Sequence, residues 1–166
     1  MRKIPKKNYF ILVLILAVSV SLTFYAREWY NTTKEYYARN SVIKESVREI
    51  NESEIYSYTL ESPAFILYAS SGTDIDIKSF ESNLRKLIVS HEMGDDIVYL
   101  NLDNIDISAF NDNLRTNFSN NVNNFSNDSL STFYIFKDGK IILVYNNVNE
   151  YSMKFLSNLF KEWEND

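Results

Sequence analysis

Residues 132–145 read TFYIFKDGKIILVY, two runs of β-branched and aromatic residues on either side of Asp138-Gly139. An Asp-Gly pair between such runs is a strong signal for a β-hairpin, because the favoured two-residue turn needs positive φ angles at both positions. The sequence therefore predicts two antiparallel strands, 132–136 and 141–145, joined by a turn at 137–140.

Two short apolar runs precede the hairpin, an unbroken one at 64–69 and one at 97–102 that Asn101 interrupts. Such runs are typical of strands buried on both faces of a sheet. Between them, apolar residues at spacings of three and four predict a helix that starts at Thr73 or Asp74 and is stopped by Gly94. The apolar residues of this helix are Ile77, Phe80, Leu84, Leu87 and Ile88.

The remaining patterns complete an alternating α/β order. A short strand is expected at 47–50, followed by a helical turn capped by Asn51, and further helices at 106–118 and 150–163. The order β-α-β-α-β-α-β-β-α implies parallel strands joined by right-handed crossovers, with the hairpin as an antiparallel edge.

Residues 9–26 read YFILVLILAVSVSLTFYA and carry no charge. This length is close to the roughly 20 apolar residues that cross a bilayer. Four basic residues lie in the first seven positions, whereas Arg27 and Glu28 cancel, so the N-terminus is expected in the cytoplasm and the rest of the chain outside it. Residues expected to contact lipid are Tyr9, Phe10, Leu14, Leu16, Phe24, Tyr25 and Trp29.

A cleaved signal peptide is the alternative to this anchor. Its cleavage site would be Phe24-Tyr25-Ala26, where a bulky residue stands in place of a small one. Both alternatives place the folded domain outside the cytoplasm, and we expect the uncleaved anchor. Residues 27–45 are charged and aromatic and are predicted to form a helical juxtamembrane stalk.

Composition excludes several classes of function. The net charge is −5 although the N-terminus is basic, which disfavours a nucleic-acid partner. The sequence has no cysteine and one histidine, so it offers no thiol redox centre, thiolate metal site or histidine-rich metal site. No metal, cofactor or catalytic residue is predicted, and we expect the protein not to be an enzyme.

Four segments give the chain a resemblance to the thioredoxin superfamily from about Ser46 to Trp163. They are Val47–Asn51, Phe65–Ala69, Tyr99–Asp103 and Ser131–Lys140, the last resembling the family's Pro-Thr-apolar-Phe-Lys-x-Gly hairpin. Within the superfamily, the chain looks most like membrane-anchored bacteriocin transport accessory proteins of low-GC bacteria. The resemblance implies a three-layer α/β/α domain.

Charge, hydropathy and the resemblance together divide the chain into four parts. They are a basic cytoplasmic N-terminus (1–8), a transmembrane anchor (9–26), the stalk (27–45) and a thioredoxin-like extracytoplasmic domain (46–166).

Two positions depart from the family pattern. Asp74-Ile75-Asp76-Ile77 stands where the resemblance implies Cys-x-x-Cys, and Ser131 stands where it implies a cis-proline. Thiol–disulfide exchange needs a thiolate, so the family's oxidoreductase activity does not carry over. A cis bond before a non-proline residue costs about 2.5–4 kcal/mol, so Leu130-Ser131 is expected to be trans.

The binding surface implied by the resemblance surrounds the start of the helix after the first buried strand. Its residues are Ser71, Gly72, Thr73, Asp74, Asp76, Leu130 and Ser131. Asp74 and Asp76 are expected to cap this helix, with a carboxylate cluster for a cation or a basic peptide as the alternative. Glu81 lies too far along the helix to join them.

Two other features are assigned structural roles. His91 is expected to interact with the carbonyl groups at the end of its helix. The Asn-rich stretch 111–127 is expected to be a solvated helix end and loop, with a binding loop as the alternative.

Two functions follow as hypotheses. The first is a redox-inactive, membrane-anchored binding or accessory module for a membrane protein or a secreted peptide, by resemblance in a bacteriocin export or immunity system. The second is a structural subunit of a membrane complex, held through its span and stalk.

Overall fold

The computed structural model describes residues 6–39, 41–72, 75–119 and 121–164. The chain divides into two compact units, Met1–Arg39 and Asn40–Asp166. Each unit is described by itself.

The first unit consists of one helix, α1 (Lys6–Arg39). The predicted apolar segment and the first part of the predicted stalk thus form one continuous helix. Its stretch Asn8–Thr33 has a mean hydropathy of 2.3, is long and apolar enough to cross a membrane, and is not buried within the protein. The Ser21 and Thr23 hydroxyls donate to carbonyls four residues earlier, at 2.9 Å in both cases, so they do not need water as a partner.

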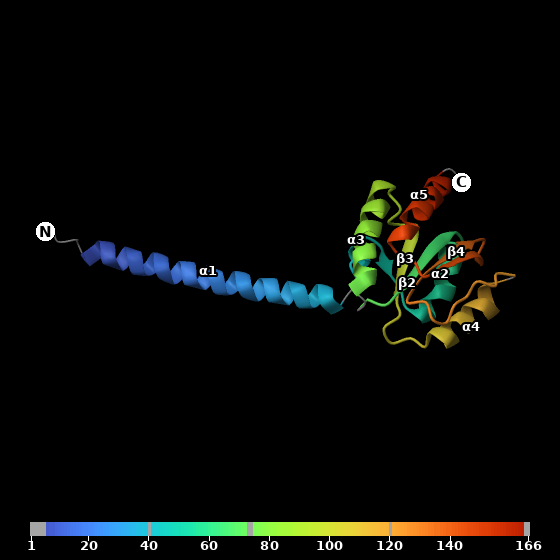
Figure 1. The fold of residues 1–166 in the computed structure, drawn as a ribbon, viewed down its shortest axis with the longest axis horizontal. Helices are drawn as coiled ribbons and strands as arrows, with labels where there is room; N and C mark the ends of the chain where they lie inside the picture. The colour runs from blue at the N-terminus through green and yellow to red at the C-terminus, as the bar shows by residue number, and fades with distance from the viewer. Residues whose placement is uncertain (1–5, 40, 73–74, 120, 165–166) are drawn as a thin grey trace. The chain divides into compact units, whose positions relative to one another are not determined.

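The second unit contains a five-stranded sheet and four α-helices, in the predicted order (Figure 1). Its strands are β1 (Arg48–Glu49), β2 (Phe65–Ser70), β3 (Ile97–Asn101), β4 (Ser131–Lys137) and β5 (Lys140–Asn146). Its α-helices are α2 (Ile55–Glu61), α3 (Ile75–Ser90), α4 (Ile107–Phe118) and α5 (Met153–Trp163). Single 3-10 turns are η1 (Ile43–Glu45), η2 (Glu52–Glu54) and η3 (Glu150–Ser152).

The strand order across the sheet is β1-β3-β2-β4-β5. β3 pairs in parallel with both β1 and β2, whereas β4 pairs antiparallel with β2 and β5. The mixed α/β architecture and the antiparallel edge predicted from the sequence are therefore confirmed. The crossovers place the carboxyl ends of β2 and β3 at the same edge of the sheet, next to the start of β4.

Side chains on the two faces of the sheet form two separate cores. From β2, Phe65 and Leu67 pack with α2 and α4, whereas Ile66 and Tyr68 pack with α3 and α5. Helices thus cover both faces, which explains why every residue of β2 is buried. Figure 1 shows α3 and α5 together beside the sheet, with α2 and α4 on its other side.

The hairpin forms as its turn chemistry predicts. Asp138 and Gly139 have φ angles of 53° and 70°, and Lys137 pairs with Lys140 across them. Two consecutive positive φ angles are the requirement that favours Asp-Gly at this turn. A register shift between Ile135 and Phe136 places a bulge in the ladder, and a bulge discourages edge-to-edge pairing with another chain.

Two predicted boundaries change. The compact unit includes Ser41 and Ile43, which are buried, so it begins before Ser46, the boundary predicted from the sequence. The chain leaves α3 through a positive φ at Glu92 (54°), not at Gly94. Gly94 instead allows a close approach, because a Cβ there would lie 3.1 Å from the Ser46 carbonyl oxygen.

Candidate functional site

The loops that follow β2 and β3 meet the loop before β4, and together they form a rim at one edge of the sheet. We define the rim by Ser71, Gly72, Asn101, Asp103 and Leu130. The Ser71 hydroxyl donates to Asp103 Oδ1 at 2.6 Å, and the Ser71 amide donates to the Leu130 carbonyl at 3.0 Å. The Asp103 amide donates to the Asn101 side-chain oxygen at 2.9 Å. Three segments distant in sequence are thus held together by short hydrogen bonds.

Gly72 is packed too closely to accept a side chain easily. A Cβ at this position would lie 3.2 Å from the Ser41 nitrogen and 3.3 Å from Asp103 Oδ2. Both distances are tighter than ordinary van der Waals contact, so the absence of a side chain allows the rim to approach the start of the compact unit.

Leu130 and Ser131, both predicted to bind a partner, have different surroundings. Leu130 is 47% exposed and is the large apolar side chain of the rim that a partner could reach. Ser131 is only 4% exposed, and its hydroxyl donates to the Val148 carbonyl at 2.8 Å. Ser131 therefore supports the rim from below and does not face a partner. The Leu130-Ser131 bond is trans, as expected, since the described residues contain no cis peptide bond.

The other predicted binding residues are less defined. Thr73 and Asp74 lie outside the described residues, so their predicted capping and binding roles stay predictions. Asp76 lies in the first turn of α3, and its side chain also lies outside the described set. Ser71, Gly72 and Leu130 are thus the predicted residues that the structure brings together.

Glu81 is the functional candidate that sequence reasoning missed. It lies on α3 and is completely buried, and its carboxylate accepts four hydrogen bonds. The Ser41 hydroxyl (2.6 Å) and the Val42 amide (2.9 Å) donate to Oε2. The Ser70 hydroxyl (2.8 Å) and the Tyr68 hydroxyl (3.2 Å) donate to Oε1. A buried carboxylate without donors would be strongly destabilising, and here each oxygen has two.

The sequence contained a signal for Glu81. It lies four residues after Ile77 and three before Leu84, so it falls on the apolar stripe that predicted the helix. An acidic residue at such a position is either an error in the assumed helix face or a buried charge with dedicated partners. The partners could not be predicted, because they come from two other segments.

Two tyrosines beside Glu81 remain protonated over a wide pH range. Burial, with a smaller contribution from the Glu81 carboxylate, raises the pKa of Tyr68 well above its ordinary value. Burial also raises the pKa of Tyr99, whose hydroxyl donates to the Ser70 carbonyl at 3.4 Å. Both hydroxyls therefore act as donors in this cluster.

The His91 side chain and Asn111 differ from the predictions. The His91 ring lies 2.7 Å from the Glu164 carboxylate and edge-on to Phe160, so it links the end of α3 to the end of α5, while the His91 amide donates to the Leu87 carbonyl at 3.1 Å. The described part of the Asn-rich stretch forms the end of α4 and a largely solvent-accessible loop, as expected, but Asn111 is an exception. Asn111 is buried and donates to the Ser126 carbonyl at 3.0 Å, and its side-chain oxygen accepts from the Tyr134 hydroxyl at 2.6 Å.

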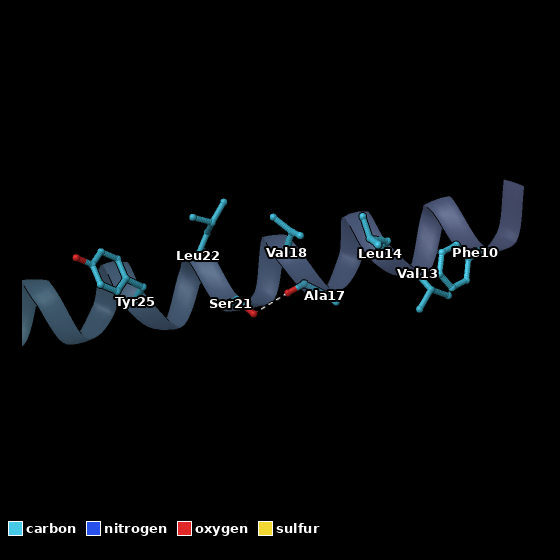
Figure 2. A pocket seen from close by; sticks show the side chains of 8 residues that line it. All are labelled: Phe10, Val13, Leu14, Ala17, Val18, Ser21, Leu22 and Tyr25. Carbon is cyan, nitrogen blue, oxygen red and sulfur yellow. Dashed lines mark hydrogen bonds between the residues drawn. The ribbon is translucent and has the colours of Figure 1, made fainter. Parts of the chain in front are cut away.

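The predicted anchor residues are all exposed on α1. Tyr9, Phe10, Leu14, Leu16, Phe24, Tyr25 and Trp29 are each between 53% and 72% exposed. Figure 2 shows eight side chains along one stretch of this helix, with the Ser21 hydroxyl bonded back to Ala17. They are Phe10, Val13, Leu14, Ala17, Val18, Ser21, Leu22 and Tyr25. Nothing within α1 covers this apolar surface, which makes the helix suitable as a membrane anchor or as a signal sequence.

No family model matches the chain, and no curated protein matches it either. In the parts of the chain that the structure describes, no group of three or more His, Asp or Glu side chains is placed to hold a metal ion. The functional interpretation therefore depends on α1, the rim and the buried Glu81 cluster.

Proposed function

We propose that this protein is a membrane-anchored, redox-inactive, thioredoxin-like binding or accessory module outside the cytoplasm. It holds a membrane protein or a secreted peptide at its rim, and its resemblance to bacteriocin transport accessory proteins suggests a role in peptide export or immunity. The observation that carries the proposal is α1, whose apolar stretch Asn8–Thr33 is unburied and precedes an independent compact unit.

Topology supports the thioredoxin-like part of the proposal. The resemblance rests partly on the β-α-β-α-β-α-β-β-α order predicted from the residue pattern and implies three layers, and the second unit has that element order with helices packed on both faces of its sheet. The rim lies at the carboxyl ends of β2 and β3, the edge where ligands bind in open α/β sheets.

The absence of cysteine from the sequence supports a non-redox role. At the rim, a Ser71–Asp103 hydrogen bond ties the residue after β2 to the loop after β3. This polar contact near the exposed Leu130 side chain suits peptide binding, with polar groups for hydrogen bonding and an apolar anchor point.

Photo-crosslinking in the native membrane tests this proposal. The crosslinking residue replaces Leu130 on the rim, Trp29 on α1, or Ile142 on β5 as the matched control. Ile142 is also an exposed aliphatic side chain (54%), but it lies toward the hairpin turn and away from the rim. A binding module gives products from Leu130 and not from Ile142.

The same experiment distinguishes the second candidate function. A structural subunit held by its membrane helix, with aromatic side chains such as Trp29 exposed on it, gives products from Trp29 alone. Replacing residues 1–33 by an unrelated anchor then abolishes its association, whereas a rim-dependent module survives the replacement. Absence of products from Leu130 contradicts the binding-module proposal.

A further inference from the structure

The Glu81 carboxylate contacts two segments that have different roles in the chain. One is the attachment segment, Ser41–Glu45, where the chain enters the compact unit two residues after the end of α1. The other is the end of β2, which continues directly into the rim through Ser71. Each carboxylate oxygen binds one of the two segments. Oε2 accepts from Ser41 and Val42, and Oε1 accepts from Tyr68 and Ser70.

Further contacts join the same two segments without Glu81. A Cβ on Gly72 would lie 3.2 Å from the Ser41 nitrogen, so rim and attachment segment are in direct contact. Ile43, next along the attachment segment, is fully buried in the core formed with α3 and α5. The attachment segment is therefore part of the support of the rim.

Separating the two segments would leave the buried Glu81 carboxylate without some of its hydrogen bonds. All described buried side-chain nitrogen and oxygen atoms have hydrogen-bond partners. If Ser41 and Val42 moved away, Oε2 would lose both its donors in a place that is fully buried. Such a state is costly for a carboxylate, so Glu81 would shift or admit water, and its bonds to β2 would change as well.

We propose that Glu81 couples the attachment segment to the rim, so that displacement of the chain at its attachment to α1 loosens the rim loop. The coupling is reciprocal, because a free energy that links two segments acts equally in both directions. It concerns the protein without any partner, so it stands or falls separately from the proposed binding function.

Hydrogen exchange of the full chain in detergent micelles, read by NMR at single amides, tests the coupling from each side. Ser41→Ala removes one donor on the attachment side, and the readout is the rim: the amides of Ser71 and Leu102, which donate to Leu130 and Ser70. Ser70→Ala removes one donor on the β2 side, and the readout is the Val42 amide.

Each variant should accelerate exchange at the opposite segment by about tenfold to a hundredfold, the range expected for one hydrogen bond to a charged group. Ser152→Ala is the matched control. Ser152 is 3% exposed, as is Ser41, and its hydroxyl accepts from the Asn149 amide, outside the Glu81 cluster. The control should leave exchange at Ser71, Leu102 and Val42 unchanged.

Two results would overturn the coupling. The first is faster exchange only on the side that carries the substitution. The second is equal acceleration throughout the sheet, matched by the Ser152→Ala control, which would mean that the serines contribute only to global stability. Acceleration confined to the attachment segment and the rim, in both directions, supports it.

Discussion

Replacing Glu81 by leucine should destabilise the compact unit by about 3–5 kcal/mol, because it leaves the donors around this buried position without their acceptor. Leucine fills a similar volume but accepts nothing, so four donors lose their acceptor. Each buried donor left unsatisfied costs about 1–3 kcal/mol, but hydroxyl groups can rotate toward other acceptors, which reduces the sum. The Val42 amide belongs to the backbone and cannot rotate toward another acceptor. The loss of its hydrogen bond therefore sets the minimum decrease in the free energy of unfolding.

Glutamine at the same position should lower the free energy of unfolding by less, about 1–2 kcal/mol. Most of the hydrogen bonds can still form and lose only the contribution of the charged acceptor. Its oxygen can accept from Ser41 and Val42, while its amide group donates to the hydroxyls of Ser70 and Tyr68, which can accept as well as donate. The exposed Glu162 provides the control: Glu162→Leu should change stability by no more than about 0.5 kcal/mol.

Urea denaturation of the full chain in micelles, followed by near-ultraviolet circular dichroism of the buried aromatic residues, measures these differences. With a slope of about 2 kcal/mol per molar urea, Glu81→Leu should lower the midpoint by about 1.5–2.5 M. A free energy of unfolding for Glu81→Leu within about 1 kcal/mol of the parent protein, or a loss for Glu81→Gln as large as that for Glu81→Leu, would show that these hydrogen bonds do not stabilise the compact unit.

Three other predictions concern separate parts of the compact unit. Burial raises the pKa values of three tyrosines, which ionise near pH 10 only when unfolded, so stability should be complete below about pH 10 and fall as the pH rises further. These tyrosines are Tyr68, Tyr99 and Tyr134. The chain has twelve tyrosines, so the readout is the last part of the tyrosinate absorbance, which should appear in step with unfolding; complete titration of all twelve before unfolding would contradict this. Gly139 has a φ of 70°, so Gly139→Ala should lower stability in thermal unfolding by about 1 kcal/mol, whereas Gly139→Asn should stay closer to the parent protein. Equal losses for the two variants would argue against backbone strain as the cause. Asn111→Ala should speed hydrogen exchange in residues 121–129 while leaving α3 protected, and unchanged exchange there would mean that Asn111 does not hold this loop.

Features encoded by neighbouring residues could be predicted from the sequence. The hairpin depends on Asp138-Gly139 and two flanking β-rich runs, and α4 depends on an apolar stripe with Asp106 as its cap. In the structure, the Asp106 side chain accepts from the Ser108 and Ala109 amides, as a helix cap should. These signals lie within a few residues of each other, so no tertiary information is needed.

Features that depend on contacts between distant segments could not be predicted. Glu81 fell on an apolar stripe, but its donors lie 11 to 40 residues away along the chain. Ser41 lies in the segment predicted as the stalk, and its burial, with a hydrogen bond to Glu81 40 residues further along the chain, has no signal in the sequence around it. Ser131 was predicted to be accessible because of its position in the family pattern, whereas its hydroxyl is used by Val148.

The proposed function requires that α1 anchors the compact unit in the membrane on the outer side. The chain has no cysteine, so a single cysteine introduced at the exposed position Lys154 on α5 can be labelled without background. Treatment of intact cells with a membrane-impermeant maleimide, followed by alkaline extraction of membranes, measures the side and the attachment together. We expect Lys154→Cys to be labelled in intact cells and the labelled protein to stay with the membranes. Labelling only after the cells are broken, or release of the protein by alkaline extraction, would contradict it.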